Sequence, residues 1–328
     1  MKEIKSENVS MEGKFGEFKS ENGIINGGII GEFKSGFVSM VGRTNVGKSS
    51  IINALVGEKV AAIANKPQTT RTAIRAIVNR ENSQIIFIDT PGIHKPKTKL
   101  GDVMVETAFG VIGEVDIVIF VIDATSLEIG KGDKIILEKI KQANRKTILL
   151  INKVDLVNRE QIAKIIELYK QEYEFTAIIP VSVTKKINLE NILQEIENNL
   201  NIGPAYYDIE EYTDQTLRQL AEEIIREKAL RLLDDEVPHG LYVETEKMKK
   251  RKTIQKEQIY DIDATIYCLR NSHKGIIIGK EGSMLKRIGT YARQDLEKMI
   301  GTKVNLKIWV KVKEDWLNND NLVKKFKI

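Results

Sequence analysis

The stretch GRTNVGKS, Gly42 to Ser49, decides the fold of the first half of the chain. It has the form G-x-x-x-x-G-K-S and follows an apolar run, 37–41, whose composition predicts a buried strand. In such a loop backbone N–H groups surround phosphates, Lys48 reaches the β- and γ-phosphates, and Ser49 supplies a magnesium ligand. The loop residues that we expect to hold the nucleotide are Gly42, Asn45, Val46, Gly47, Lys48, Ser49 and Ser50.

Short β-branched runs alternate with helical stretches from Gly36 to about Leu200. Such alternation predicts an α/β fold, with a mostly parallel, doubly wound sheet, helices on both faces, and a ligand at the carboxyl ends of the strands. The expected strands are 37–41, 85–89, 115–123, 147–152 and 177–182, and two of the expected helices are 130–143 and 159–173.

Two further motifs follow predicted strands. In DTPG, Asp89 is placed to hold magnesium through water, and the Gly92 N–H can face the γ-phosphate. In NKVD, which begins at Asn152, the Lys153 stem can cover a base and Asp155 can accept from the ring N–H and amine of guanine. A site built on such bonds rejects adenine by roughly 10⁴ or more. Either tetrapeptide alone is more often a surface turn, but the order and spacing of the three motifs predict a GTP site.

A second glycine-rich stretch, GIIIGKEGSMLKRIG from Gly275 to Gly289, lies in the C-terminal half. Glycine-rich turns before helices often hold phosphates, but this loop lacks the Lys-Ser that grips a γ-phosphate and magnesium. The surrounding pattern predicts an α+β domain after a linker at Gly203-Pro204. Its expected elements are a helix at 214–235, strands at 241–248 and 259–269, a helix pair around the loop with the second helix at 283–300, and a last strand near 304–311.

Charge is distributed unevenly along the 328 residues, whose net charge is +5. The segment from Leu241 to Ile328 carries a net charge of about +9, and the rest carries about −4. This asymmetry indicates a C-terminal segment that meets a polyanion, or a solvated basic surface. The single cysteine, Cys268, excludes an intrachain disulfide and a structural zinc site of several cysteines, and fits a reducing cytosol. No secretory signal is visible, and no apolar run approaches the roughly 20 residues that span a bilayer.

The three nucleotide motifs resemble those of the Era-like GTPases, in the translation-factor-like group of P-loop GTPases. PQTTR, 67–71, matches the first switch of that family, with Thr70 as the magnesium-sensing threonine or Thr69 as the alternative. DTPGIHKPK, REK (226–228) and EVPH (236–239) also match. The PVSV stretch matches the guanine-edge loop and adds Ser182 and Val183 to the site, although the family usually has Ala at 183 and Pro at Thr44. The resemblance therefore implies GTP and GDP as ligands and Mg²⁺ held by Ser49, Thr70 and Asp89.

The element order after Asp214 resembles a type II KH domain, whose GxxG loop clamps about four single-stranded nucleotides. Glycines let the sugar-phosphate approach, and cationic side chains add salt-sensitive contacts. Glu281 departs from the glycine that the family often has there, and its charge could lower the affinity for RNA. The implied RNA-binding residues are Gly275, Ile276, Ile277, Ile278, Gly279, Lys280, Glu281, Gly282, Lys286 and Arg287, with Lys274 as a further phosphate contact.

Many GTPases place a water-orienting glutamine where this chain has Ile93, so either hydrolysis is slow or another group orients the water. The Thr70 carbonyl and the Gly92 N–H are candidates, and His94 is a weaker candidate for a base. Asn45 matches a position that holds K⁺ in related GTPases, and a K⁺ ion there would supply the charge of an arginine finger. The expected catalytic residues are Lys48, Thr70, Gly92 and Asn45.

The expected organisation is a disordered N-terminal extension or start-site artefact (1–34), a GTP-binding domain (35–202), a linker (203–213), a KH domain (214–313) and a C-terminal tail (314–328). The resemblance implies a cytoplasmic monomer that binds the 3′ end of 16S ribosomal RNA and acts in 30S subunit assembly. The basic segment 247–256 could touch RNA or the inner face of the cell membrane, or could be a solvated hairpin tip. The rival interpretations are an RNA-binding protein with a slow GTP timer and a membrane-associated signalling GTPase, against which the lack of a lipid anchor counts.

Overall fold

Six strands form the first sheet, in the order β2-β3-β1-β4-β5-β6. The computed structural model describes residues 32–64, 66, 69–93, 96–234, 237–252 and 257–325. Edge strand β2 runs antiparallel to β3, and the other pairs are parallel, which confirms the predicted α/β class. The strands are β1 (Lys34–Val41), β2 (Ile74–Arg80), β3 (Ser83–Asp89), β4 (Ile117–Asp123), β5 (Lys146–Asn152) and β6 (Ala177–Pro180).

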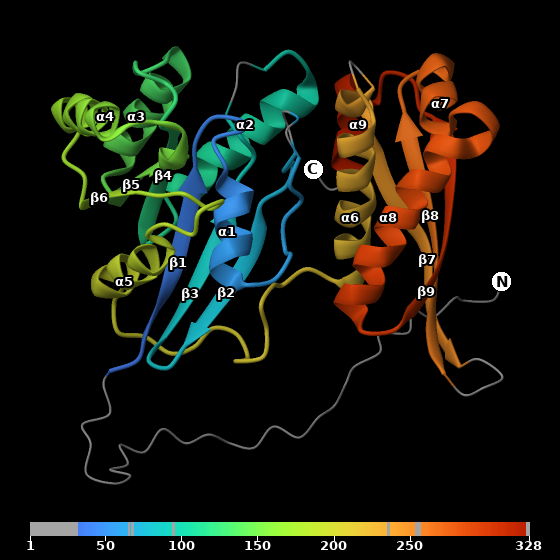
Figure 1. The fold of residues 1–328 in the computed structure, drawn as a ribbon, viewed down its shortest axis with the longest axis horizontal. Coiled ribbons are helices and arrows are strands. Elements are labelled where there is room, and N and C mark those ends of the chain that lie inside the picture. The colour runs from blue at the N-terminus through green and yellow to red at the C-terminus, as the bar shows by residue number, and fades with distance from the viewer. Residues whose placement is uncertain are drawn as a thin grey trace, which may run out of the picture. The chain divides into compact units, whose positions relative to one another are not determined.

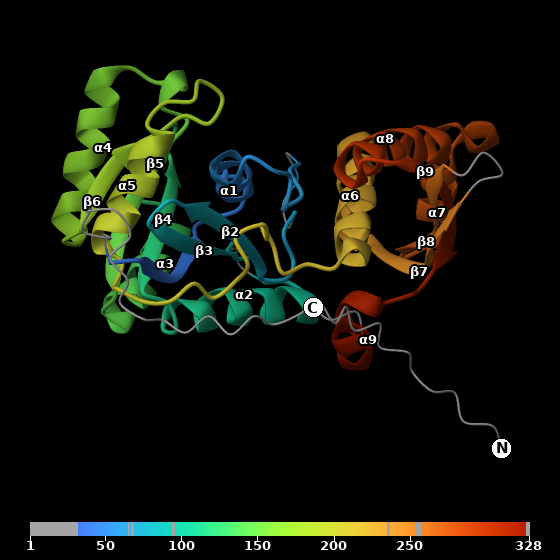
Figure 2. The same ribbon diagram turned by 90° about the horizontal axis from the view of Figure 1, so that it is seen from below.

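Helices cover both faces of this sheet (Figures 1 and 2). The apolar side of α1 (Lys48–Val56) shares one core with α5 (Leu189–Asn199). On the other face, α2 (Lys99–Ile112), α3 (Lys131–Ala143) and α4 (Arg159–Glu172) enclose a second core. Because both faces are covered, the central strand β4 is apolar nearly throughout, and the polar residues lie at strand ends.

The residues between the two domains lie along the edge of this sheet. Tyr212 accepts a backbone hydrogen bond from Ile77 of β2 at 2.9 Å, and the Asn79 amide donates to the carbonyls of Ile209 and Glu211. An exposed edge strand presents unpaired backbone groups, so this segment both connects the domains and covers the edge of the sheet.

The second domain has a three-stranded sheet, β7-β8-β9, with helices on one face. Strand β8 (Gln258–Cys268) pairs antiparallel with β7 (Tyr242–Lys252) and parallel with β9 (Lys303–Val312). The helices are α6 (Leu217–Leu232), α7 (Asn271–Ile278) and α8 (Ser283–Ile300), so the predicted element order is confirmed. Their apolar sides and the inner face of the sheet form the core of this domain.

Two expectations need correction. Residues 247–252, expected in a hairpin tip, continue strand β7, where Lys252 pairs with Gln258. The backbone of these residues pairs with β8, which a run of charged side chains does not reveal in the sequence. Lys34, placed in the N-terminal extension, already belongs to β1. Residues 1–31, 253–256, Pro67, Gln68, His94 and Glu236 lie outside the described residues.

The C-terminal residues form structure rather than an extended tail. A short 3₁₀ turn, η4 (Trp316–Asn318), precedes α9 (Asp320–Lys325). Trp316 is fully buried, donates its indole N–H to the Gly240 carbonyl at 3.0 Å, and clusters with Leu100 and Met104 of α2. A side chain of this size contributes a large apolar area, so the C-terminal segment is part of the core. Among the described helices, none is both long and apolar enough to cross a membrane.

Candidate GTP and RNA sites

The phosphate loop connects β1 to α1, and its conformation and close contacts favour glycine at two positions. A Cβ on Gly42 would lie 2.4 Å from the Val121 carbonyl oxygen. Gly47 has φ +104° and caps α1, and a Cβ there would lie 2.2 Å from the side-chain amide nitrogen of Asn152. The loop is therefore pressed against the ends of β4 and β5, with the N-terminus of α1 facing the place of the phosphates.

Lys48 lies inside this loop, with only 7% of its surface exposed. Its amino group donates to the carbonyls of Gly42 at 3.2 Å and Arg43 at 3.0 Å. Burial lowers the pKa of Lys48 to about 8, and the nearby charge of Asp89 opposes this shift. The amino group is thus a cation held in a desolvated position, which strengthens its attraction for a phosphate.

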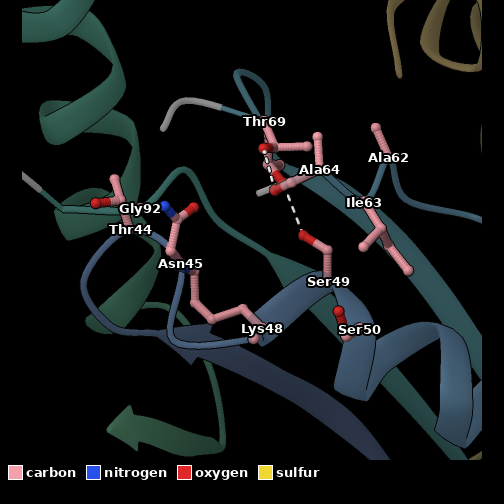
Figure 3. A pocket seen from close by; sticks show the side chains of 12 residues that line it. Thr44, Asn45, Lys48, Ser49, Ser50, Ala62, Ile63, Ala64, Thr69 and Gly92 are labelled. Atoms are coloured by element: carbon pink, nitrogen blue, oxygen red, sulfur yellow. Dashed lines mark hydrogen bonds between the residues drawn. The ribbon is translucent and has the colours of Figure 1, made fainter. Parts of the chain in front are cut away.

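The three residues expected to hold magnesium converge. The Ser49 hydroxyl donates to Asp89 at 2.7 Å, the Thr70 hydroxyl donates to the same oxygen at 3.1 Å, and the two hydroxyls are 2.9 Å apart. Thr69 instead donates to the carbonyls of Ala64 and Lys66, and Figure 3 shows Thr69 beside Ala64. Thr70 is therefore the threonine that reaches this cluster.

Asp89 is fully buried, and its second carboxylate oxygen has no hydrogen-bond partner in the described structure. Burial raises the pKa of Asp89, and Lys48 and the two hydroxyls oppose the shift. A buried oxygen without a partner beside two hydroxyls is a donor set that suits Mg²⁺, which prefers oxygen ligands and retains several waters. The residues therefore fit this ion.

The residues expected to bind guanine meet at the end of β5. Asn152 donates to the Val46 carbonyl at 2.8 Å, and its own side-chain oxygen is buried without a partner in the described residues. Asp155 lies in η1 (Val154–Leu156) and accepts from the Ser182 hydroxyl at 2.5 Å. Val183 packs its side chain toward the first core, so only its backbone is left for the base edge. The hydrogen bond between Ser182 and Asp155 joins the two loops that are expected to bind guanine.

Asp123 belongs to this region although the motifs did not indicate it. Lys153 has φ +67° and donates to the Asn45 carbonyl at 3.0 Å and to Asp123 at 2.6 Å. Asp123 ends strand β4, beside the end of β5, and this position at a strand terminus was the signal available in the sequence. The pair fixes the stem of Lys153 next to the phosphate loop.

The DTPG turn packs directly on the phosphate loop. A Cβ on Gly92 would lie 2.8 Å from the Thr44 Cα, and the Ile93 amide donates to the Gly42 carbonyl at 3.1 Å. The Ile93 side chain is buried in the second core and cannot hydrogen-bond water. Asn45 has φ +64° and is exposed. The pocket is lined by Thr44, Asn45, Gly47, Lys48, Ser49, Ser50, Ala62, Ile63, Ala64, Thr69, Thr70 and Gly92 (Figure 3).

The second glycine loop joins α7 to α8 through η3 (Lys280–Gly282). Gly279 has φ +72°, and a Cβ there would lie 2.9 Å from the Met284 amide nitrogen. Gly282 has φ +77° and caps α8. Glu281 has φ +51°, a left-handed conformation that costs roughly 1–2 kcal/mol without glycine. The loop geometry therefore requires glycine at its ends and favours it at 281.

The predicted RNA-binding side chains divide into exposed and buried ones. Gly275, Lys280, Glu281, Lys286 and Arg287 are exposed, and Lys274 is half-buried. Ile277 is fully buried in the domain core because it faces inward on α7, so it cannot line an RNA groove; Ile276 is exposed and Ile278 packs partly against the core. A groove between α8 and β9 continues from Gly282, and the motifs missed most of its residues: Leu285, Gly289, Thr290, Arg293, Leu306 and Ile308.

Comparison with known families gives two matches, and each covers one of the two glycine loops. Residues 37–153 match a family described as 50S ribosome-binding GTPase, and residues 236–317 match the KH domain family. The class is therefore a P-loop GTPase joined to a KH domain.

The relatives share this whole arrangement. GTPase Era of Clostridioides difficile (strain 630) is 49% identical over 90% of this chain and 98% of its own, and GTPase Era of Alkaliphilus metalliredigens is 47% identical over 89% and 98%. A crystal structure of Era with MgGDPNP and nucleotides 1506–1542 of 16S ribosomal RNA has a TM-score of 0.85, with 39% identity over 90% of this chain and 98% of that one. A variant of Aquifex aeolicus Era bound to GDP·AlF4⁻ also has a TM-score of 0.85, with 39% identity over 90% and 99%. The chain belongs to the Era family of GTPases.

Proposed function

We propose that the protein is a GTP-hydrolysing switch that binds 16S ribosomal RNA near its 3′ end through the KH domain and acts in assembly of the 30S subunit. The observation that carries this proposal is the pair of glycine loops, one beside the Ser49–Thr70–Asp89 cluster and one beside exposed Lys280. The relative crystallised with MgGDPNP and nucleotides 1506–1542 of 16S ribosomal RNA supports both ligands.

The residues of the first site would divide the work of phosphoryl transfer among themselves. Lys48 would neutralise the β- and γ-phosphates, and the Gly92 N–H would face the γ-phosphate. Ser49, Thr70 and Asp89 would hold Mg²⁺, which supplies charge neutralisation at the phosphates when bound. Because Ile93 is buried, it orients no water, and we expect a slow intrinsic rate with the Thr70 carbonyl and Gly92 N–H as the remaining orienting groups.

Asn45 is proposed to hold K⁺ beside the phosphates. Its side chain lines the pocket and is exposed, so an ion could reach it together with nucleotide oxygens. Hydrolysis should be roughly tenfold or more faster in KCl than in NaCl, because a fixed charge replaces an arginine finger. The measurement is single-turnover hydrolysis at equal ionic strength, with Asn45→Ala as the variant that loses the difference. Equal rates in both salts would remove K⁺ from the mechanism.

The proposed RNA function predicts a nucleotide-dependent affinity. An oligonucleotide of the 16S 3′ end should bind more tightly with a non-hydrolysable GTP analogue than with GDP or no nucleotide. Gly279→Ala should abolish binding, because its Cβ collides with the Met284 amide. The same affinity in all three states would favour the rival interpretation, in which the GTP site is a slow timer that does not gate this RNA.

Glu281→Gly provides a matched change in the opposite direction in the same binding assay. It relieves the left-handed strain at 281 and removes a negative charge from the loop. The affinity for the oligonucleotide should rise by roughly three- to tenfold. The salt dependence of this affinity should change less than it would if a cationic side chain were added or removed. An unchanged affinity would place residue 281 outside the RNA contact.

We further infer a cytoplasmic monomer whose partner is the 30S subunit. Lys249, Lys250 and Lys252 of β7 are exposed cations that suit RNA phosphates. The alternative is contact of these lysines with the anionic face of the cell membrane, and vesicles of anionic lipid in place of RNA would separate the two.

A further inference from the structure

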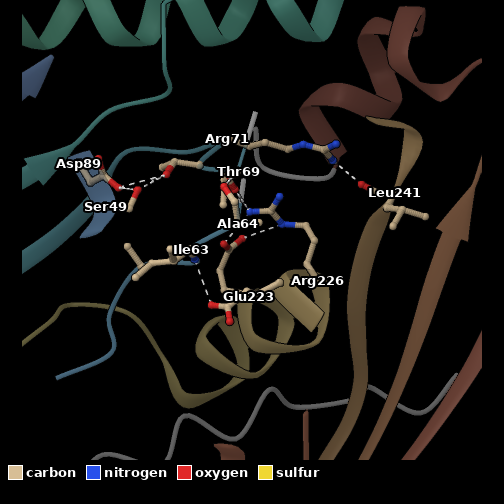
Figure 4. A network of polar contacts seen from close by, with 12 residues as sticks. Ser49, Ile63, Ala64, Thr69, Arg71, Asp89, Glu223, Arg226 and Leu241 are labelled. Carbon is tan, nitrogen blue, oxygen red and sulfur yellow. Dashed lines mark hydrogen bonds and ion pairs between the residues drawn. The ribbon is translucent and has the colours of Figure 1, made fainter. Parts of the chain in front are cut away.

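Three consecutive residues of the first switch, Thr69, Thr70 and Arg71, make contacts in different directions. The Thr70 hydroxyl reaches Ser49 and Asp89 in the GTP site. The carbonyl on one side of it, that of Thr69, accepts a hydrogen bond from the Arg226 guanidinium of α6. Figure 4 shows Ser49 with Asp89, and Thr69 with Arg226, in one view. The switch threonine is therefore adjacent to a contact with the second domain.

Arg71, on the other side of Thr70, is also bound to the second domain. Its guanidinium donates to the carbonyl of Leu241 (Figure 4) and, at 3.0 Å, to that of His239 in η2 (Pro238–Gly240). It also lies 5.4 Å from the centre of the Trp316 ring, a cation–π contact. Thr70 is thus held from both neighbours, once through a backbone carbonyl and once through a side chain.

Both arginines are almost completely buried, with Arg71 5% and Arg226 3% exposed. Burial, and then the charge of Arg226, lower the pKa of Arg71 to about 9. Arg226 also pairs with Glu223 of its own helix at 2.7 Å. A buried cation is costly unless its hydrogen bonds are well formed. These contacts therefore favour the one arrangement of the switch against the second domain in which both arginines keep their hydrogen bonds.

The same helix also contacts the segment that leads into the first switch. Glu227 is fully buried and accepts from the Ile63 amide at 3.0 Å and from Lys59 at 3.0 Å. Lys59 also pairs with Asp295 of α8 at 2.7 Å. Because Gly282 of the second glycine loop caps the N-terminus of α8, packed elements connect that loop to the switch.

We propose that the KH domain positions Thr70 for GTP hydrolysis, and that Arg226 and Arg71 are the positioning residues. The proposal rests on the proposed GTPase function and adds the route by which the RNA domain acts on it. Neither arginine is among the residues that line the pocket at the phosphate loop. Each fixes the backbone beside Thr70, so that the hydroxyl stands with Ser49 and Asp89.

The test uses the full chain with Arg226→Ala. Single-turnover GTP hydrolysis should slow by roughly tenfold, the effect of losing a charge-assisted hydrogen bond, and should need more Mg²⁺. GDP affinity should change little, because GDP has no γ-phosphate and its binding therefore does not depend on the position of Thr70. Arg226→Lys keeps a cationic donor and should restore part of the rate. A role in stability alone would not give this combination of shifted Mg²⁺ dependence and unshifted GDP affinity.

Arg218→Ala is the matched control, since Arg218 lies on the same helix and donates to the Thr245 carbonyl at 2.5 Å within its own domain. If Arg226→Ala fails to fold, Arg71→Lys provides the second variant, with Arg75→Ala as its control, because Arg75 pairs with Asp214 at the surface. Hydrolysis and Mg²⁺ dependence equal to those of the controls would overturn the inference.

RNA binding is measured on the same proteins, so that a failure of the proposed RNA function can be told apart from a failure of the positioning inference. If the unmodified protein binds no 3′-end oligonucleotide, the proposed RNA function fails, while the hydrolysis assay still decides whether Arg226 positions Thr70. If the oligonucleotide binds and hydrolysis is unchanged in both arginine variants, the RNA function stands and the positioning inference falls.

Discussion

Replacing Asp155 with Asn is expected to lower the affinity for GTP by roughly 10³-fold or more and to create a preference for xanthosine triphosphate. A carboxylate accepts from the ring N–H and the amine of guanine, whereas the Asn amide would bring a donor against that amine. Xanthine has an oxygen in place of the amine, so the amide can donate to it. An unpaired buried polar group is costly, and this gives the effect its size.

The measurement is competition among GTP, xanthosine triphosphate and ATP for the protein at fixed Mg²⁺. Ser182→Ala is the control, because it removes the 2.5 Å hydrogen bond to Asp155 and leaves the carboxylate in place. We expect that control to weaken GTP binding modestly and to keep the base preference. Unchanged GTP affinity in Asp155→Asn would show that another group reads the base.

Local spacing in the sequence was sufficient to place the residues expected in the GTP site at one edge of the sheet. Lys48 and Ser49 belong to one motif, Asp89 ends β3, and Asp155 lies in η1, just after the end of β5, in a sheet whose parallel strands have their carboxyl ends at one edge. Strand alternation alone therefore brought distant motifs together. The choice between Thr69 and Thr70 could not be made in this way, because adjacent side chains point in different directions and only the docked backbone fixes which one faces Asp89.

Contacts that depend on long-range packing left no such signal. Trp316 lies outside every motif that indicated the GTP or RNA site, yet it is buried against Leu100 and under Arg71. Ile277 lies in a run of three isoleucines, and the phase of α7 decides which of them faces the core. Both facts follow from how elements pack, which spacing along one segment does not specify.

Lys48→Met is expected to reduce GTP affinity by roughly 10³-fold, because a buried cation that faces the phosphates is replaced by a neutral side chain. The nucleotide-free protein should nevertheless become more stable by about 1–2 kcal/mol at pH 7, since the variant no longer buries that charge. The lost hydrogen bonds to Gly42 and Arg43 make the gain smaller than desolvation alone would give.

The pH dependence gives this prediction its sign. The folded pKa of Lys48, about 8, is below its ordinary value of 10.5. Between these values the unfolded chain binds more protons, so the stability of the unmodified protein rises with pH there, and the destabilising effect is complete below pH 8. The advantage of Lys48→Met in urea unfolding should therefore be constant below pH 8 and shrink as pH rises toward 10.5. Lys146→Met, which replaces an exposed lysine bonded to the Asn199 carbonyl, should show no such change. An advantage that stays constant up to pH 10.5 would mean that Lys48 keeps an ordinary pKa in the folded protein.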